Sequence, residues 1–116
     1  MTDLKISEMM KMQYNLWEKN KNKWSPLEPK YARNSMLWIV EELGEAIAII
    51  KKKGDEEIMN NPEVRKHYVE ELSDVLMYFN DMLVSYNISA DEISKAYIEK
   101  HNKNMNRDYE TEYSNK

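Results

Sequence analysis

The stretch that decides the fold is residues 35–50, which read SMLWIVEELGEAIAII. Apolar side chains cover nearly the whole circumference of this segment, a pattern typical of a helix buried among other helices. Its charged residues are Glu41, Glu42 and Glu45. At about 100° per residue, Glu42 and Glu45 lie one turn apart on one side of the helix, with Glu41 beside them. The sequence therefore predicts a buried helix that carries three carboxylates.

A second stretch, residues 69–84, repeats this pattern with VEELSDVLMYFNDMLV. It is also mostly apolar, yet Glu71 and Asp74 share one helical face because they are three residues apart. Tyr78 and Asp81 continue along the same face. Two helices of the core are thus expected to present pairs of acids.

These paired acids indicate a metal site. An ionised carboxylate that is buried without a partner is strongly unfavourable, whereas carboxylate oxygens are the ligands that Mg²⁺ and Mn²⁺ prefer. The alternative, that each set is the solvated face of its helix, stays open for either set alone. Di-iron bundles use Glu-x-x-His pairs, which this sequence replaces by Glu-x-x-Glu and Glu-x-x-Asp. The spacing does not name a reaction, but it predicts a site made of Glu42, Glu45, Glu71 and Asp74.

The remaining sequence indicates an all-α chain of four helices. A helical apolar stripe covers residues 6–21, two prolines mark a loop at 24–29, and Gly54 suits the end of the second helix. Asn61 before a proline, and Ser89 three residues before a glutamate, are helix starts. We expect an up-and-down, four-helix-bundle-like fold with helices over about 6–21, 29–53, 61–86 and 89–107, and one helical turn at 55–60.

Length and composition limit the possible classes of protein. The 116 residues are enough for one domain, 1–116, with a core of about 24–107 and a mobile tail at 108–116. Two glycines exclude a Gly-rich phosphate loop, no cysteine is present, and the net charge of −4 argues against nucleic-acid binding. The N-terminus lacks a signal-peptide pattern and the longest apolar run is short, so a cytoplasmic protein without a membrane partner is expected.

The fourth helix supplies the cationic candidates. Lys100, Asn104 and Arg107 follow one another at i, i+4 and i+7, so they share a face that can contact a phosphate chain. The alternative is a solvated helix end. Beside four acids suited to a metal, these residues favour a site for a metal-bound triphosphate. Aromatic residues that could stack on a base are Trp17, Trp24, Trp38 and Tyr78.

Together these motifs are similar to those of a known family. EELGE at 41–45, ELSD at 71–74 and the Lys100-x-x-x-Asn104-x-x-Arg107 helix resemble the MazG-like all-α nucleotide pyrophosphohydrolase superfamily. The resemblance covers about residues 24–107. ARNSMLWIVEELGEA and EELSDVLMY look especially like the dCTP pyrophosphatase branch.

The resemblance implies a MazG-type fold, a homodimer or homotetramer, and Mg²⁺ as cofactor, with Mn²⁺ as a possible substitute. It implies hydrolysis of a (deoxy)nucleoside triphosphate to the monophosphate and pyrophosphate, as in house-cleaning of the nucleotide pool. Glu42, Glu45, Glu71 and Asp74 would be the metal ligands, with Glu41 assisting catalysis. The substrate-binding residues would be Lys100, Asn104, Arg107, Tyr78, Asn34, Trp24 and Trp38.

Two alternatives stay open. Trp38 stands where a smaller residue is common in the dCTP branch, and it would narrow the pocket on the Glu42 face. A dUTPase-type activity, or a broad activity on modified nucleotides, is therefore compatible with the sequence. A non-catalytic helical module that binds a nucleotide or a protein is the alternative from another class.

Overall fold

The computed structural model describes residues 3–108, which form five helices and no β-strand. The all-α expectation is confirmed. None of the helices in this part of the chain is both long and apolar enough to span a membrane. The tail expected at 108–116 lies, apart from Asp108, outside the described residues. The helices are α1 (Ile6–Asn20), α2 (Pro29–Lys53), α3 (Asp55–Asn60), α4 (Pro62–Ser85) and α5 (Ala90–Met105).

The helix ends follow the local sequence closely. Gly54 ends α2 with a φ of 83°, a conformation that glycine adopts without steric cost, and its N–H donates to Ile50 O. Asn61 caps α4, because its side-chain oxygen accepts from the N–H groups of Glu63 and Val64. Ser89 caps α5 in the same way. The expected single turn at 55–60 is α3.

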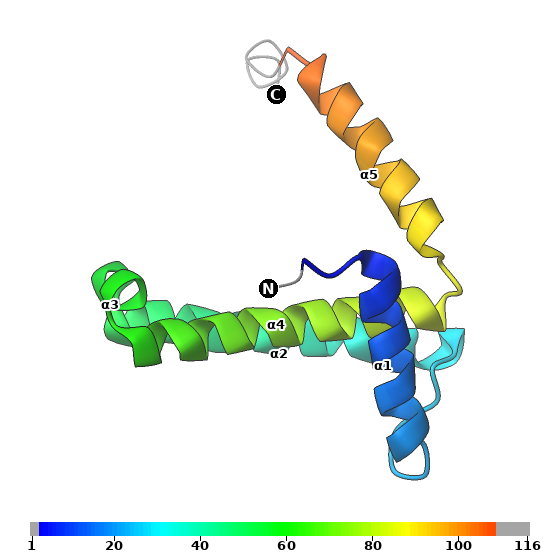
Figure 1. Ribbon diagram of the computed structural model, residues 1–116, viewed down its shortest axis with the longest axis horizontal. Helices are drawn as coiled ribbons and strands as arrows, with labels where there is room; N and C mark the ends of the chain where they lie inside the picture. Colours follow the sequence, from blue (N-terminus) through cyan, green and yellow to red (C-terminus); the bar gives the residue numbers. More distant parts are fainter. Residues whose placement is uncertain (1–2, 109–116) are drawn as a thin grey trace.

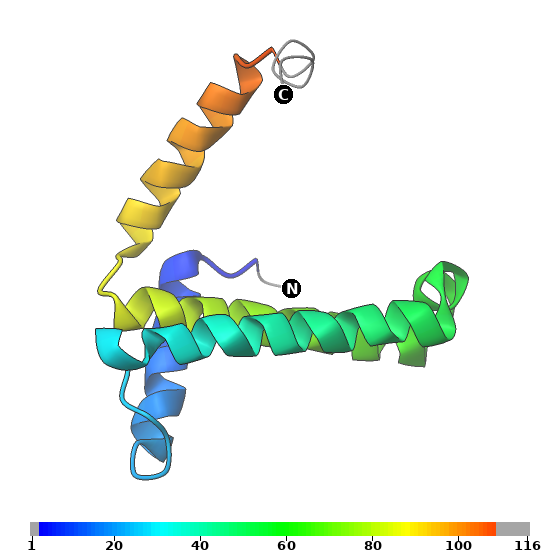
Figure 2. The same ribbon diagram turned by 180° about the vertical axis from the view of Figure 1, so that it is seen from behind.

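The frame of the molecule is an antiparallel hairpin of α2 and α4. The two long helices lie side by side along the longest axis, and α3 joins them at one end (Figures 1 and 2). At the other end α1 crosses α4, and α5 leaves the hairpin at a steep angle. The two acidic stretches thus face each other along the hairpin.

The core inside one chain is small. Among the described residues, the buried apolar side chains are Ala32, Ala46, Ile49 and Leu83. The radius of gyration is 17.5 Å, against about 13 Å for a compact domain of this length. The accessible surface is 9461 Å², against roughly 6,700 Å² for a compact monomer of this mass. Much apolar surface is therefore uncovered in a single chain.

The expected four-helix bundle does not close within one chain. Among the helices of residues 3–108, α5 approaches only α1, and it leaves α2 and α4 (Figure 1). The turn before α5 contains Asn87 in a left-handed conformation with a φ of 59°, which asparagine tolerates better than most residues. Apolar side chains of α5 stay exposed, among them Tyr97, Ile98 and Met105. Sequence periodicity shows which face is apolar, but not which chain covers it.

Candidate functional site

Three of the four predicted metal ligands converge at the middle of the hairpin. Glu42 and Glu45 come from α2 and Glu71 from α4, and one carboxylate oxygen of each lies within 4.8 Å of the others. Glu42 and Glu71 are half-buried, whereas Glu45 is exposed. The i, i+3 spacing on α2 stacks two acids on one side of the helix, and the antiparallel pairing brings the third opposite them.

The three carboxyl groups perturb one another strongly. Burial, a hydrogen bond with Glu71 and the neighbouring negative charges raise the pKa of Glu42 to about 7. The pKa of Glu45 is raised, chiefly by its hydrogen bond with Glu71. The pKa of Glu71 is lowered because Glu42 and Glu45 hydrogen-bond to it. Full ionisation of the cluster is therefore unfavourable when no cation neutralises it.

Two oxygens of this cluster have no hydrogen-bond donor. Within residues 3–108, Glu42 Oε2 and Glu71 Oε2 are buried and make no hydrogen bond. One basic side chain is close to these acids. His67 lies one turn before Glu71 on α4, and its Nε2 is 3.4 Å from Glu71 Oε1. Buried carboxylate oxygens without donors are unfavourable, and three converging carboxylates are the donor set that a hard divalent cation prefers. The residues present fit a Mg²⁺ or Mn²⁺ ion.

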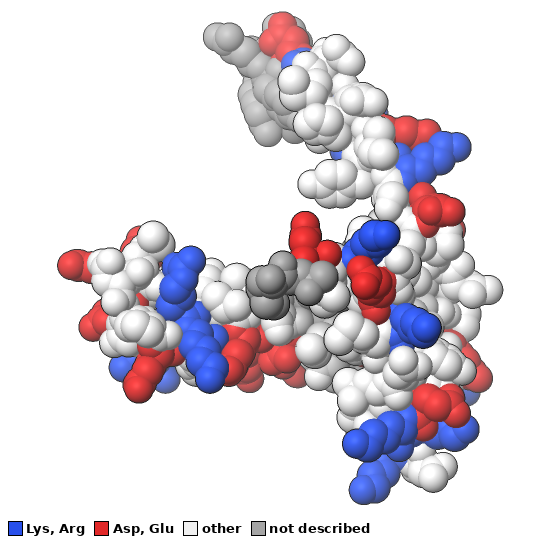
Figure 3. Space-filling view, in the orientation of Figure 1, with Lys and Arg blue, Asp and Glu red and all other residues white. Residues whose placement is uncertain are grey.

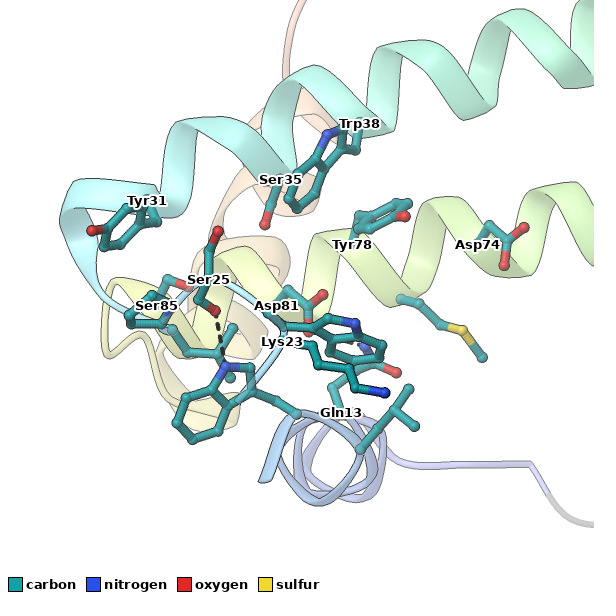
Figure 4. A pocket seen from close by; sticks show the side chains of 16 residues that line it. Gln13, Lys23, Ser25, Tyr31, Ser35, Trp38, Asp74, Tyr78, Asp81 and Ser85 are labelled. Atoms are coloured by element: carbon teal, nitrogen blue, oxygen red, sulfur yellow. Dashed lines mark hydrogen bonds between the residues drawn. The ribbon is translucent and has the colours of Figure 1, made fainter. Parts of the chain in front are cut away.

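An aromatic cavity lies further along the hairpin toward α1, and Asp74 is the predicted metal ligand that lines it. Its volume is about 490 Å³, which is large enough for a nucleobase and sugar. It lies where α1, the 21–28 loop, α2 and α4 meet (Figure 4). Its lining residues include Trp17, Trp24, Tyr31, Trp38 and Tyr78 as aromatic walls, and Gln13, Ser35, Asp74, Asp81 and Ser85 as polar groups.

Specific contacts hold this cavity open. The indole N–H of Trp17 donates to Ser25 O at 2.9 Å, which ties the loop that carries Trp24 to α1. The rings of Trp38 and Tyr78 pack at a centroid distance of 5.4 Å and an angle of 48° across α2 and α4. Burial and the acidic neighbours raise the pKa of Tyr78, so its hydroxyl keeps its proton. These contacts link the walls of the cavity to one another.

A second cavity adjoins the acids on the opposite side. It has a volume of about 370 Å³ and lies between α2 and α4 near α3. Glu45 and Glu71 form its boundary with the acid cluster, and its other polar lining residues are Lys52, Lys53, Glu63 and His67. Lysines and carboxylates therefore stand side by side at this end of the hairpin.

The predicted site residues divide into two groups. Asp74 lies outside the three-acid cluster and lines the aromatic cavity, where its charge raises the pKa of Glu42 and Glu45. Glu41 is exposed on α2. Trp24, Trp38 and Tyr78 all line the aromatic cavity, as a base-binding role requires. Asn34 is half-buried on α2, outside the lining of both cavities described above.

The basic residues of α5 are not brought to the acids within one chain. Lys100 is exposed, and Asn104 Oδ1 accepts from Arg107 Nη1 at 3.4 Å. Because α5 diverges from the hairpin, these three residues lie far along a separate arm (Figure 1). The expectation that they share a site with the acids therefore requires a second chain.

Sequence reasoning missed one residue pair in the aromatic cavity. Gln13 Nε2 donates to Asp81 Oδ1 at 2.9 Å, and this hydrogen bond joins α1 to α4. Gln13 is 8% exposed, although it is polar. Its position four residues after Met9 and four before Trp17 places it on the apolar stripe of the first helix. This polar residue on an otherwise apolar stripe was the sequence feature that could have revealed the pair.

Comparison of the chain with protein-family models, curated proteins and solved structures found no match.

Proposed function

We propose that the protein hydrolyses a (deoxy)nucleoside triphosphate to the monophosphate and pyrophosphate. One observation carries this proposal. The acid cluster lies along the α2–α4 hairpin between the aromatic cavity, which Asp74 lines, and a second cavity, in which Lys52 and Lys53 stand beside carboxylates. A nucleotide has the same order of parts, with a base, then an α-phosphate, then a pyrophosphate group. The motif resemblance to MazG-like pyrophosphohydrolases agrees with this order.

The carboxylates of Glu42, Glu45 and Glu71 are the proposed ligands of a divalent cation, with Asp74 one turn further along α4. The cation would supply neutralisation of the phosphate charge that grows in the transition state. Asp74 also lines the aromatic cavity, so it lies at the junction between the base and the phosphates. These residues would thus position the α-phosphate between the two cavities.

The reaction that fits this arrangement is attack of water on the α-phosphorus. A bond forms between the water oxygen and phosphorus, and the bond to the bridging oxygen breaks. Pyrophosphate leaves with the bonding electron pair, and the proton of the water passes to a carboxylate. Glu41 is exposed beside the cluster and is the proposed proton acceptor.

The leaving pyrophosphate would lie in the second cavity, against its two lysines. Lys52, Lys53 and His67 reach this cavity from α2 and α4 of the same chain. Lys100 and Asn104 would join them from α5 of a second copy, since α5 does not return to its own hairpin. Mixing a Lys100→Ala variant with a Glu71→Gln variant would then restore hydrolysis, because each supplies the residue that the other lacks.

A second copy of the chain is the proposed partner. On α2, the apolar residues Met36, Val40, Leu43, Ile47 and Ile50 are between 39% and 65% exposed and recur at alternating spacings of four and three. This spacing is typical of a stripe that packs against another helix. Much of the surface of α5 and of the hairpin on the face shown in Figure 3 carries neither acidic nor basic groups. The expected bundle would then form between chains, as a dimer or a tetramer.

The test is to incubate the protein with Mg²⁺ and each common dNTP and NTP and to separate the products by ion-exchange chromatography. Monophosphate with pyrophosphate is the expected result, and Glu71→Gln should abolish it. Glu57→Gln, the same change on the exposed surface of α3, is the matched control and should retain activity. Diphosphate with phosphate would show that another bond is cut. No turnover of any nucleotide would favour a non-catalytic module.

A further inference from the structure

The aromatic walls of the cavity do not explain how one base is selected. Every base has a π-face, so stacking on Trp24, Trp38 or Tyr78 tolerates all of them. Hydroxyl groups donate or accept as required, so Ser35 and Ser85 also adapt to either kind of base edge. Selection needs a polar group whose hydrogen-bonding sense is fixed.

Three charged residues line the cavity: Lys23, which is exposed on the 21–28 loop and only donates, Asp74, which is proposed to face the phosphates, and Asp81, which is half-buried. Asp81 is therefore the fixed group deepest among the aromatic walls. It lines the cavity, and Figure 4 shows its carboxylate between Gln13 and Tyr78. Gln13 Nε2 donates one of its two N–H groups to Asp81 Oδ1, and Gln13 is only 8% exposed, so Asp81 is the more accessible member of the pair. An ionised carboxylate only accepts hydrogen bonds. The pair therefore presents an acceptor, held at a fixed position, to whatever enters the cavity.

The structure of the pair explains why the carboxylate is available. Burial raises the pKa of Asp81, and the hydrogen bond from Gln13 lowers it, so one donor partly offsets the cost of burying this charge. A second donor, supplied by a ligand, would stabilise the anion further. Exocyclic amines of cytosine and adenine are such donors, whereas uracil and hypoxanthine present a carbonyl at the corresponding position.

We propose that Asp81, positioned by Gln13, selects nucleotides whose base carries an exocyclic amine and rejects the keto analogues. This inference rests on the proposed nucleotide hydrolysis and deepens it, because it separates dCTP-type from dUTP-type activity. Asp81 contacts the base, and Gln13 acts as a positioning residue through Asp81.

The test compares two pairs of nucleotides that differ in this group, dCTP with dUTP and dATP with dITP. The ratio of kcat/KM within a pair cancels differences in ring size. We expect the amino member to be preferred in at least one pair by roughly 10- to 100-fold, as for other base-edge contacts. In Asp81→Asn, Gln13 can still donate to the side-chain oxygen, and the new amide N–H faces the base. The preference should then fall or reverse toward the keto member.

Two further variants complete the design. Gln13→Met keeps the length of the side chain but removes the donor, so it should raise KM for the amino member more than it lowers kcat. If circular dichroism shows that Asp81→Asn does not fold, Gln13→Met serves as the test variant in its place. Asp91→Asn makes the same chemical change on the exposed first turn of α5 and should leave the preference unchanged.

Binding is measured separately with the non-hydrolysable α,β-imido analogues of dCTP and dUTP by calorimetry. A wild-type preference for the keto members, or an unchanged preference in Asp81→Asn, would overturn the role of Asp81 while hydrolysis stands. An amino preference in binding without any hydrolysis would support Asp81 and overturn the proposed reaction. If the wild type neither hydrolyses a nucleotide nor binds an analogue, both proposals fail.

Discussion

Buried carboxylates have different partners in two parts of the α2–α4 hairpin. We call these parts the aromatic half, which is the cavity that contains Asp81, and the acidic half, which is the cluster of Glu42, Glu45 and Glu71. In the aromatic half, Asp81 receives a hydrogen bond from Gln13, which belongs to a helix that crosses the hairpin. In the acidic half, Glu42 and Glu71 each keep a buried oxygen without a donor, within the described residues. Both halves place negative charge in a partly buried position, but in the acidic half His67 reaches only Glu71 Oε1, and two buried oxygens of the cluster stay without a donor among the described residues.

The difference shows how a site can be distinguished from an ordinary polar contact. A buried acid that the protein itself satisfies contributes to fold and recognition, since its cost is offset before a ligand arrives. Acids that repel one another destabilise the chain until a cation binds. We therefore expect the acidic half to gain stability from a bound cation, whereas the carboxylate of the aromatic half already has a partner in the protein.

The largest expected effect comes from removing a carboxylate of the acidic half. Glu71→Gln should lower kcat/KM by more than about 100-fold, a loss that even the outer partners of a bound metal can cause. The same variant should lose the rise in Tm that Mg²⁺ gives to the wild type, because ligand binding stabilises only a folded site. Calorimetry with and without Mg²⁺ measures this. An unchanged Mg²⁺ response would remove the basis for the cation site.

The next effect comes from removing the donor of the aromatic half. Gln13→Leu should lower the free energy of unfolding by about 1–3 kcal/mol, since it leaves the buried Asp81 carboxylate without its protein partner. Urea denaturation measures the change. The exposed Asn15→Leu on the same helix is the control and should change stability little. If both variants unfold at the same urea concentration, the two halves do not differ as described.

The pH dependence of stability should also distinguish the acids. Because the pKa of Glu42 is raised to about 7 in the folded protein, this group stabilises the fold fully below its unfolded pKa of 4.5. That contribution is lost as the pH rises through 7. In a chelating buffer, Glu42→Gln should therefore flatten the decline of Tm between these two pH values. If Tm of the variant declines as steeply as that of the wild type, other groups cause the pH dependence.

The smallest effect is expected at Gly44, which lies inside α2 between the acids. A Cβ atom placed there meets no atom of this chain within 4 Å, within the described part of the structure. Gly44→Ala should stabilise α2 by about 0.5–1 kcal/mol through its higher helix propensity. Thermal unfolding at several protein concentrations tests this. A loss of stability that grows with dissociation of the oligomer would instead place a second chain against Gly44.

Local sequence determined the helices and their ends. The prolines, Gly54, Asn61 and Ser89 define boundaries through short-range sterics and hydrogen bonds, and the observed helices end within one or two residues of those expected. The spacing of Glu42, Glu45 and Glu71 also fixed which helical faces they occupy, since a helix turns by a constant angle per residue. Their convergence then needed only the antiparallel pairing of the two helices.

Tertiary structure decided what periodicity cannot express. It separated Asp74 from the three-acid cluster, placed α5 with Lys100 away from the acids, and joined Gln13 to Asp81 across 68 residues of sequence. Each of these depends on how one helix crosses another, which is set by packing between distant side chains rather than by local spacing. The sequence by itself therefore determined the helices and the faces of the acids, and the tertiary structure decided which of those acids meet a partner.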